Sequence, residues 1–76
     1  MGKARRRLGL TLKRLRLERG LTQASFAKRA GISRVYLAQL ERSAENPPIR
    51  IPSLRTLDRL ASALHVQLTD LLQEEP

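Results

Sequence analysis

The sequence predicts an all-α fold, a compact domain of five short helices. Leucine is the most frequent residue, aromatic residues make up only 3% of the chain, and Val and Ile are few, a composition that favours helices over strands. Apolar residues recur at intervals of three and four, as on the buried face of a helix. A chain of this length buries roughly 60% of its unfolded surface, which is enough for one modest core.

The first predicted elements are a basic arm and a helix. Residues 1–7 (MGKARRR) are expected to be a flexible arm, and residues 8–76 to form the folded domain. The first helix is expected over residues 8–19. Gly20 suits the position just beyond its end, where a residue with positive φ terminates many helices. The predicted core face of this helix consists of Leu8, Leu12 and Leu15.

The next segment has the spacing of two helices joined by a tight turn. Gly31 can take positive φ without steric cost, so the chain can reverse there, and Ala27 is small enough for two steeply crossed helices to approach closely. Thr22 and Ser33 are suited to N-cap the helices that follow. The pair is expected at residues 22–30 and 33–42, with Phe26, Ala30, Ile32, Leu37 and Leu40 facing inward. This is the layout of a helix-turn-helix, whose second helix enters the DNA major groove. An ordinary helical hairpin without a ligand is the alternative.

The last third of the chain is predicted to be a loop and two helices. Three of the four prolines lie in the loop, at residues 43–52, and favour an extended path there. Ser53 is suited to cap a fourth helix ending near Leu64, and Thr69 to cap a short fifth helix. The expected core face of the fourth helix consists of Leu54, Leu57, Leu60, Ala61 and Leu64, and the fifth helix holds Leu71 and Leu72.

The positive charge of the chain is large and unevenly distributed. The formal net charge is +8, and all fifteen Lys and Arg lie at or before Arg59. Residues 60–76 contain three acids and no base. One end of the molecule is therefore suited to meet a polyanion, and DNA becomes the leading partner. A merely solubilising excess of charge is the alternative.

Several classes of site are not expected in this chain. There is no cysteine, and His65 is the single histidine, so neither a disulfide, a metal site nor a catalytic base is predicted. No glycine-rich loop is present to hold a phosphate cofactor. We therefore expect no enzyme and no cofactor. A long apolar run and a secretory signal are also absent, which predicts a cytoplasmic protein.

The segment from about residue 8 to residue 72 resembles the lambda-repressor/Cro-like (XRE-type) helix-turn-helix family of bacterial and phage regulators. The matching segments are LKRLRLERGLTQASFAKRAGIS, YLAQLER and PSLRTLDRLASALHV. The resemblance implies a five-helix domain that regulates transcription by binding operator DNA, usually as a dimer on two half-sites. Small members are similar to restriction-modification controller proteins or phage repressors. The chain departs from the family pattern after the third helix, where Ser43 and Ala44 stand in place of the usual glycine.

The resemblance also assigns roles to residues at the expected DNA surface. It implies that the start of the third helix reads bases, through Ser33, Arg34, Val35 and Gln39. Arginine can bond guanine, glutamine can bond adenine, and valine can touch a thymine methyl. Phosphate contacts are expected from Gln23, Tyr36, Arg42 and Arg50 and, in the arm, from Lys3, Arg5, Arg6 and Arg7. The alternatives are a phosphate contact for Arg34, an exposed first-turn residue for Gln23, and a cover for the core edge for Tyr36.

The family pattern further implies a buried ion pair between Arg16 and Glu41. Arginine's planar fork matches a carboxylate in a narrow gap between helices. Two solvated surface charges are the alternative.

A homodimer is expected because a single small helix-turn-helix buries little area on DNA. The candidate interface is the base-free C-terminal stretch, where Leu68, Leu71 and Leu72 are predicted to be exposed on one side. The alternative is that these leucines only close the core of the monomer.

Two other partners compete with DNA. An antitoxin or co-regulator of this family would contact mainly another protein. A basic amphipathic helix on an anionic membrane would suit the first helix alone, and it would leave the glycine turn unexplained.

Overall fold

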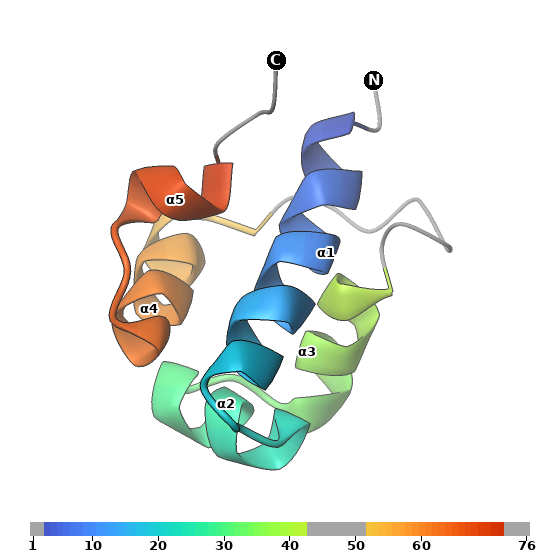
Figure 1. Ribbon diagram of the computed structural model, residues 1–76, viewed down its shortest axis with the longest axis vertical. Helices are drawn as coiled ribbons and strands as arrows, with labels where there is room; N and C mark the ends of the chain where they lie inside the picture. Colours follow the sequence, from blue (N-terminus) through green and yellow to red (C-terminus); the bar gives the residue numbers. More distant parts are fainter. Residues whose placement is uncertain (1–2, 43–51, 73–76) are drawn as a thin grey trace.

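The computed structural model is all-α, which confirms the predicted fold class. The structure describes residues 3–42 and 52–72, with side chains from residue 8 onward, and these residues contain no strand. The helices are α1 (Lys3–Glu18), α2 (Gln23–Ala30), α3 (Arg34–Glu41), α4 (Leu54–Leu64) and α5 (Leu68–Leu72). Figure 1 shows α1 running through the middle of the bundle, with α3 on one side of it and α4 and α5 on the other. The predicted loop lies outside the described residues except for Pro52, and so do Ser43 and Ala44.

Helix α1 begins earlier than the sequence analysis expected. The backbone is helical from Lys3, so five residues of the predicted arm belong to this helix, and the expected start at Leu8 was wrong. The physical reason is local, because the segment KARRR consists of strong helix formers without glycine or proline. The helix ends at Glu18, and Gly20 just beyond it has φ +66°, the left-handed conformation predicted for this position. The Leu21 amide then donates to the Arg16 carbonyl over 3.0 Å, which closes the last turn.

The predicted caps and turn of α2 and α3 are confirmed. The Thr22 hydroxyl accepts from the Ser25 amide, and the Ser33 hydroxyl accepts from the Tyr36 amide, each over 3.0 Å. Gly31 has φ +72° and ψ +32°, the left-handed conformation that reverses the chain. Each N-cap satisfies an amide that the helix itself leaves without a partner. These short-range bonds fix where both helices start.

Helix α4 begins as predicted and ends in an unexpected way. The Ser53 hydroxyl accepts from the Thr56 amide over 3.2 Å, which confirms the predicted cap. At the other end His65 has φ +57°, so a histidine occupies the left-handed position that glycine fills after α2. Histidine is among the residues that tolerate this conformation better than most, although less well than glycine. The Val66 amide donates to the Ala61 carbonyl over 3.0 Å and completes the termination.

Helix α5 does not start at the predicted cap. It begins at Leu68, so Thr69 lies inside it and the expected capping role of Thr69 was wrong. The start is stabilised instead by Asp70, whose Oδ2 accepts from the Gln67 amide over 2.9 Å. An acidic side chain in the first turn also interacts favourably with the positive end of the helix dipole.

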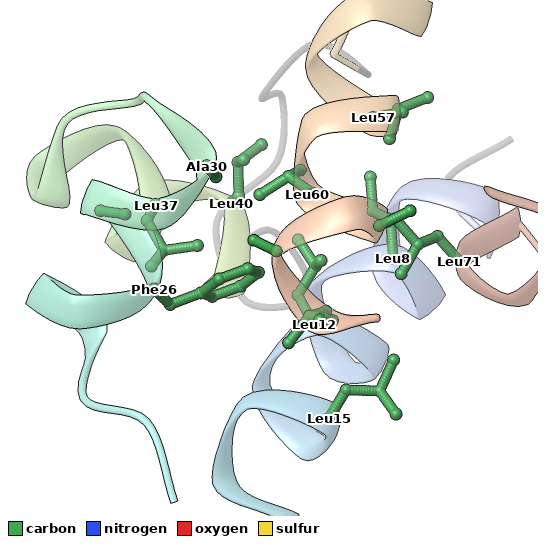
Figure 2. Close-up of a cluster of buried hydrophobic side chains, with 14 residues drawn as sticks. Leu8, Leu12, Leu15, Phe26, Ala30, Leu37, Leu40, Leu57, Leu60 and Leu71 are labelled. Atoms are coloured by element: carbon green, nitrogen blue, oxygen red, sulfur yellow. The ribbon is translucent and has the colours of Figure 1, made fainter. Parts of the chain in front are cut away.

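The core is one cluster of leucine and alanine side chains around Phe26. Figure 2 shows the ring of Phe26 pointing from α2 toward Leu12 of α1. Helix α2 packs against α3 and α4, α1 packs against α3 and α5, and α4 packs against α5. The largest fully buried side chains are Phe26, Leu12, Leu37, Leu40, Leu60, Leu64 and Leu71. Because every helix contributes to this cluster, the relative positions of α2 and α3 are set by the whole bundle.

Two predictions about leucine exposure were wrong. Leu54 was expected in the core, but it is the first residue of α4, one turn before Leu57, and it is 69% exposed. Leu71 was expected on an exposed face with Leu68 and Leu72, but it is 1% exposed and belongs to the core. Adjacent residues of a helix point about 100° apart, so burying Leu71 turns Leu72 outward. Leu72 is 46% exposed, and Leu68 is half-buried against the core.

Candidate nucleic-acid interface

Helix α3 has one apolar face and one polar face. Leu37 and Leu40 on the inner face are buried. The outer face carries Arg34, Val35 and Gln39, all of which are exposed, with Arg42 following at the C-cap. Val35 is 60% exposed although it is apolar. This face therefore presents a cation, an amide and an aliphatic side chain to solvent along one side of a helix.

The N-termini of α2 and α3 are electropositive. Neither helix has an acidic residue in its first turn, where an acid would offset the positive end of the helix dipole. Arg34 adds a full positive charge at the start of α3. The amides of a first helical turn point outward without intrahelical partners, and such helix ends are suited to anions.

Tyr36 has an intermediate position between core and surface. Its side chain is half-buried and packs against the hydrophobic cluster. Its amide is used by the cap of Ser33. The side chain thus covers the edge of the core, the alternative that the sequence left open, and a phosphate contact remains a proposal.

Arg16 and Glu41 form the buried ion pair that the family resemblance implied. Arg16 Nε donates to Glu41 Oε2 over 2.7 Å, and Nη2 donates to Oε1 over 3.2 Å. The two side chains are 10% and 2% exposed, so they are not the solvated charges of the alternative. Arg16 Nη1 also donates to the Leu21 carbonyl over 2.9 Å. The pair connects α1, the segment before α2, and the end of α3.

Gln23 is the third member of this network, and the sequence analysis missed its partner. Its Nε2 donates to Glu41 Oε1 over 3.1 Å, so the N-terminus of α2 is bonded to the C-terminus of α3. The side chain is half-buried, in contrast to the exposed residue of the alternative. No spacing rule could have revealed this bond, because it joins residues eighteen positions apart in different helices.

Further cations surround the turn between α2 and α3. Lys28 and Arg29 in the last turn of α2 are exposed. The Arg59 guanidinium reaches the turn from α4, because a Cβ placed on Gly31 would lie 3.9 Å from its Nη1. The sequence analysis did not connect Arg59 with the turn, since the two are brought together only by the packing of α2 on α4.

Several predicted phosphate ligands lie outside the described side chains. Arg50 lies outside the described residues. For Lys3, Arg5, Arg6 and Arg7 the description is limited to their helical backbone in α1.

Other kinds of site find no support in the described part of the chain. Within it, no group of three His, Asp or Glu residues is arranged to hold a metal ion. None of the helices there has the length and apolar character needed to cross a membrane.

Residues 12–71 match the profile of a protein family described as helix-turn-helix. The chain belongs to this helix-turn-helix family. The match includes α2, α3 and α4 completely, and with them the residues of the ion-pair network. Family membership agrees with the expectation that the matched residues, 12–71, do not form an enzyme.

The similar proteins include named regulators. The immunity repressor protein of Bacillus phage phi105 is 43% identical over 68 residues, which are 90% of this chain and 44% of the repressor. The helix-turn-helix chain thus spans less than half of that relative. The restriction-modification controller protein C.AhdI from Aeromonas hydrophila has a TM-score of 0.72 and 32% identity, over 86% of this chain and 91% of the controller. The solved structure of SinR, the master regulator for biofilm formation, in complex with DNA has a TM-score of 0.77 and 29% identity, over 87% of this chain and 98% of the SinR chain in that structure.

Proposed function

We propose that this protein binds double-stranded DNA as a transcriptional regulator, with α3 in the major groove. The observation that carries the proposal is the outer face of α3, where exposed Arg34, Val35 and Gln39 project from an electropositive end of the molecule. An α-helix fits the major groove, and residues near its N-terminus reach base edges. The phage repressor among the relatives and the DNA complex of SinR support this proposal.

The base contacts are assigned to the first two turns of α3. Arg34 is proposed to donate two hydrogen bonds to a guanine, and Gln39 to pair with an adenine. The exposed methyl groups of Val35 suit a thymine methyl, which explains an apolar side chain on a charged surface. Ser33 caps the helix with its hydroxyl oxygen and stands beside these residues at the helix start.

The phosphate contacts are assigned to the residues around this face. Gln23 and Tyr36 are proposed to bond phosphates beside the groove, and Arg42 to pair with a phosphate at the far end of α3. Arg50 and the basic residues at the N-terminus complete the proposed set, namely Lys3, Arg5, Arg6 and Arg7. Such contacts position the protein without reading sequence.

A homodimer on two half-sites about 34 Å apart is part of the proposal, because a single domain of this size buries little area on DNA. With Leu71 inside the core, the candidate C-terminal interface is reduced to Leu72 and the half-buried Leu68. We expect a dimer mass by gel filtration with light scattering. A complex in which one copy of the protein is bound to the operator would contradict the proposed homodimer.

Binding-site selection on random DNA tests the function directly. We expect one enriched motif with two related half-sites, and Arg34→Ala should flatten the preference at one base position of each, by about 1–3 kcal/mol of discrimination. Arg55→Ala is the matched control, because this exposed arginine lies in the first turn of α4, away from α3. Failure to enrich any sequence would contradict the proposal and favour a protein partner.

A further inference from the structure

We propose that Glu41 is a positioning residue for Gln23, fixing its amide so that one N–H group faces outward for a phosphate. This inference rests on the proposed DNA-binding function, in which Gln23 is a phosphate contact. The carrying observation is the hydrogen bond from Gln23 Nε2 to Glu41 Oε1, 3.1 Å long, which connects the start of α2 with the end of α3.

The orientation of the Gln23 amide follows from hydrogen-bond chemistry. A carboxylate can only accept, whereas a glutamine amide has two donor hydrogens on its nitrogen and an oxygen that only accepts. With Glu41 ionised in its pair with Arg16, the group next to its oxygen must be a donor. The Gln23 nitrogen therefore faces Glu41, and the reverse orientation would bring two acceptor oxygens together.

Glu41 can hold the amide because its own carboxylate is buried and hydrogen-bonded. Its side chain is 2% exposed, and both of its oxygens accept bonds from Arg16. Arg16 is held in turn by the Leu21 carbonyl. The amide of Gln23 thus meets a carboxylate fixed by helix α1, and the half-buried side chain loses its freedom before DNA arrives.

The remaining N–H of Gln23 is then available at an electropositive helix end. An amide nitrogen carries two hydrogens, and Glu41 uses one of them. The other lies in the first turn of α2, which contains no acidic residue of its own, and the charge of the neighbouring Glu41 is balanced by Arg16. Because Glu41 belongs to α3, the same bond also fixes this contact relative to the helix proposed to read bases.

A contact of this kind has a distinctive signature in binding experiments. Gln23 is neutral, so its replacement should weaken binding without changing the slope of log affinity against log salt. Replacing a Lys or Arg that neutralises a phosphate changes that slope by about 0.9, because a counterion is no longer released. A residue that only stabilises the fold would change the melting temperature and leave the affinity of the folded protein unaltered.

A double-mutant cycle on the full chain tests the inference. The variants are Gln23→Ala, Glu41→Gln and the double variant, titrated with the duplex obtained by selection, at a temperature where circular dichroism shows each to be folded. Gln23→Ala should weaken binding about tenfold at an unchanged salt slope. Glu41→Gln should weaken binding in the wild-type background but by less than about twofold in the Gln23→Ala background. Gln67→Ala, an exposed glutamine before α5, is the control and should leave affinity unaltered.

Hydrogen exchange of the glutamine side-chain amides in the free wild-type protein provides a second measurement. It can be made even if Glu41→Gln does not fold. We expect one Gln23 amide proton of the wild type to be protected from exchange relative to those of Gln67. Independent effects in the cycle, or equally fast exchange of both Gln23 protons, would overturn the inference and leave the proposed function standing. A wild-type protein that binds no selected duplex would overturn both.

Discussion

Arg16 and Glu41 are buried charges, and each is tolerated because the other is present. The side chains are 10% and 2% exposed and joined by two hydrogen bonds. We predict that Glu41→Ala lowers the free energy of unfolding by about 3–5 kcal/mol, because Arg16 is left as an uncompensated charge. Urea denaturation measures this. Glu18→Ala is the control, since Glu18 pairs with Arg14 and Arg19 on the surface and such pairs contribute at most about 1 kcal/mol. Similar effects of the two variants would contradict the prediction.

His65 is strained where a glycine would not be. It has φ +57° at the end of α4 and an exposed side chain, so its ring is not needed for packing. A non-glycine residue in this conformation costs roughly 1–2 kcal/mol, and a glycine loses more chain entropy on folding. We predict that His65→Gly raises the free energy of unfolding by about 1 kcal/mol, measured by thermal denaturation. His65→Ala, which keeps the Cβ, should give no such gain, and a gain as large as that of glycine would contradict the strain argument.

Among the helices, the packing of α2 on its neighbours depends on small residues at the contacts. Ala27 is 2% exposed in α2, whereas Ala24, on the same helix, is exposed. We predict that Ala27→Leu destabilises the domain by about 1–3 kcal/mol through overpacking and reduces DNA affinity, because α2 is pushed away from its neighbours. Ala24→Leu adds the same atoms on the outside and should change stability by less than about 0.5 kcal/mol. Denaturation and duplex titration of both variants measure the difference, and equal effects would contradict the packing argument.

The elements that the sequence predicted best are those fixed by local bonds. Thr22, Ser33 and Gly31 act on residues within five positions, so their roles follow from residue type and spacing. The burial of Leu71 and the bond from Gln23 to Glu41 depend on how distant helices meet, which spacing alone does not encode.

The starting residues of α1 and α5 were predicted less well. Helix α1 extends to Lys3 because strong helix formers continue the first helix without a stop signal. At α5, both Thr69 and Asp70 are polar residues near the start of the helix and could have capped it. The Asp70 carboxylate is the one that accepts the hydrogen bond there. For the interface, the family resemblance implied the ion pair that the structure contains, whereas the base and phosphate contacts remain predictions.

At the scale of the whole molecule, the separation of charge predicts how binding depends on salt. The basic residues end at Arg59, and those of the N-terminus lie on or next to α1. We predict that replacing Arg5, Arg6 and Arg7 with Gln keeps the helix, because glutamine is a comparable helix former, and weakens binding to all duplexes alike. The slope of log affinity against log salt should become shallower by up to about 0.9 for each phosphate that is no longer neutralised. Titrations at several salt concentrations, on the selected duplex and on a scrambled one, measure both effects. A change in sequence preference with an unchanged slope would mean that these arginines read bases, whereas a decrease in affinity and slope of equal size on both duplexes assigns them to the phosphate backbone.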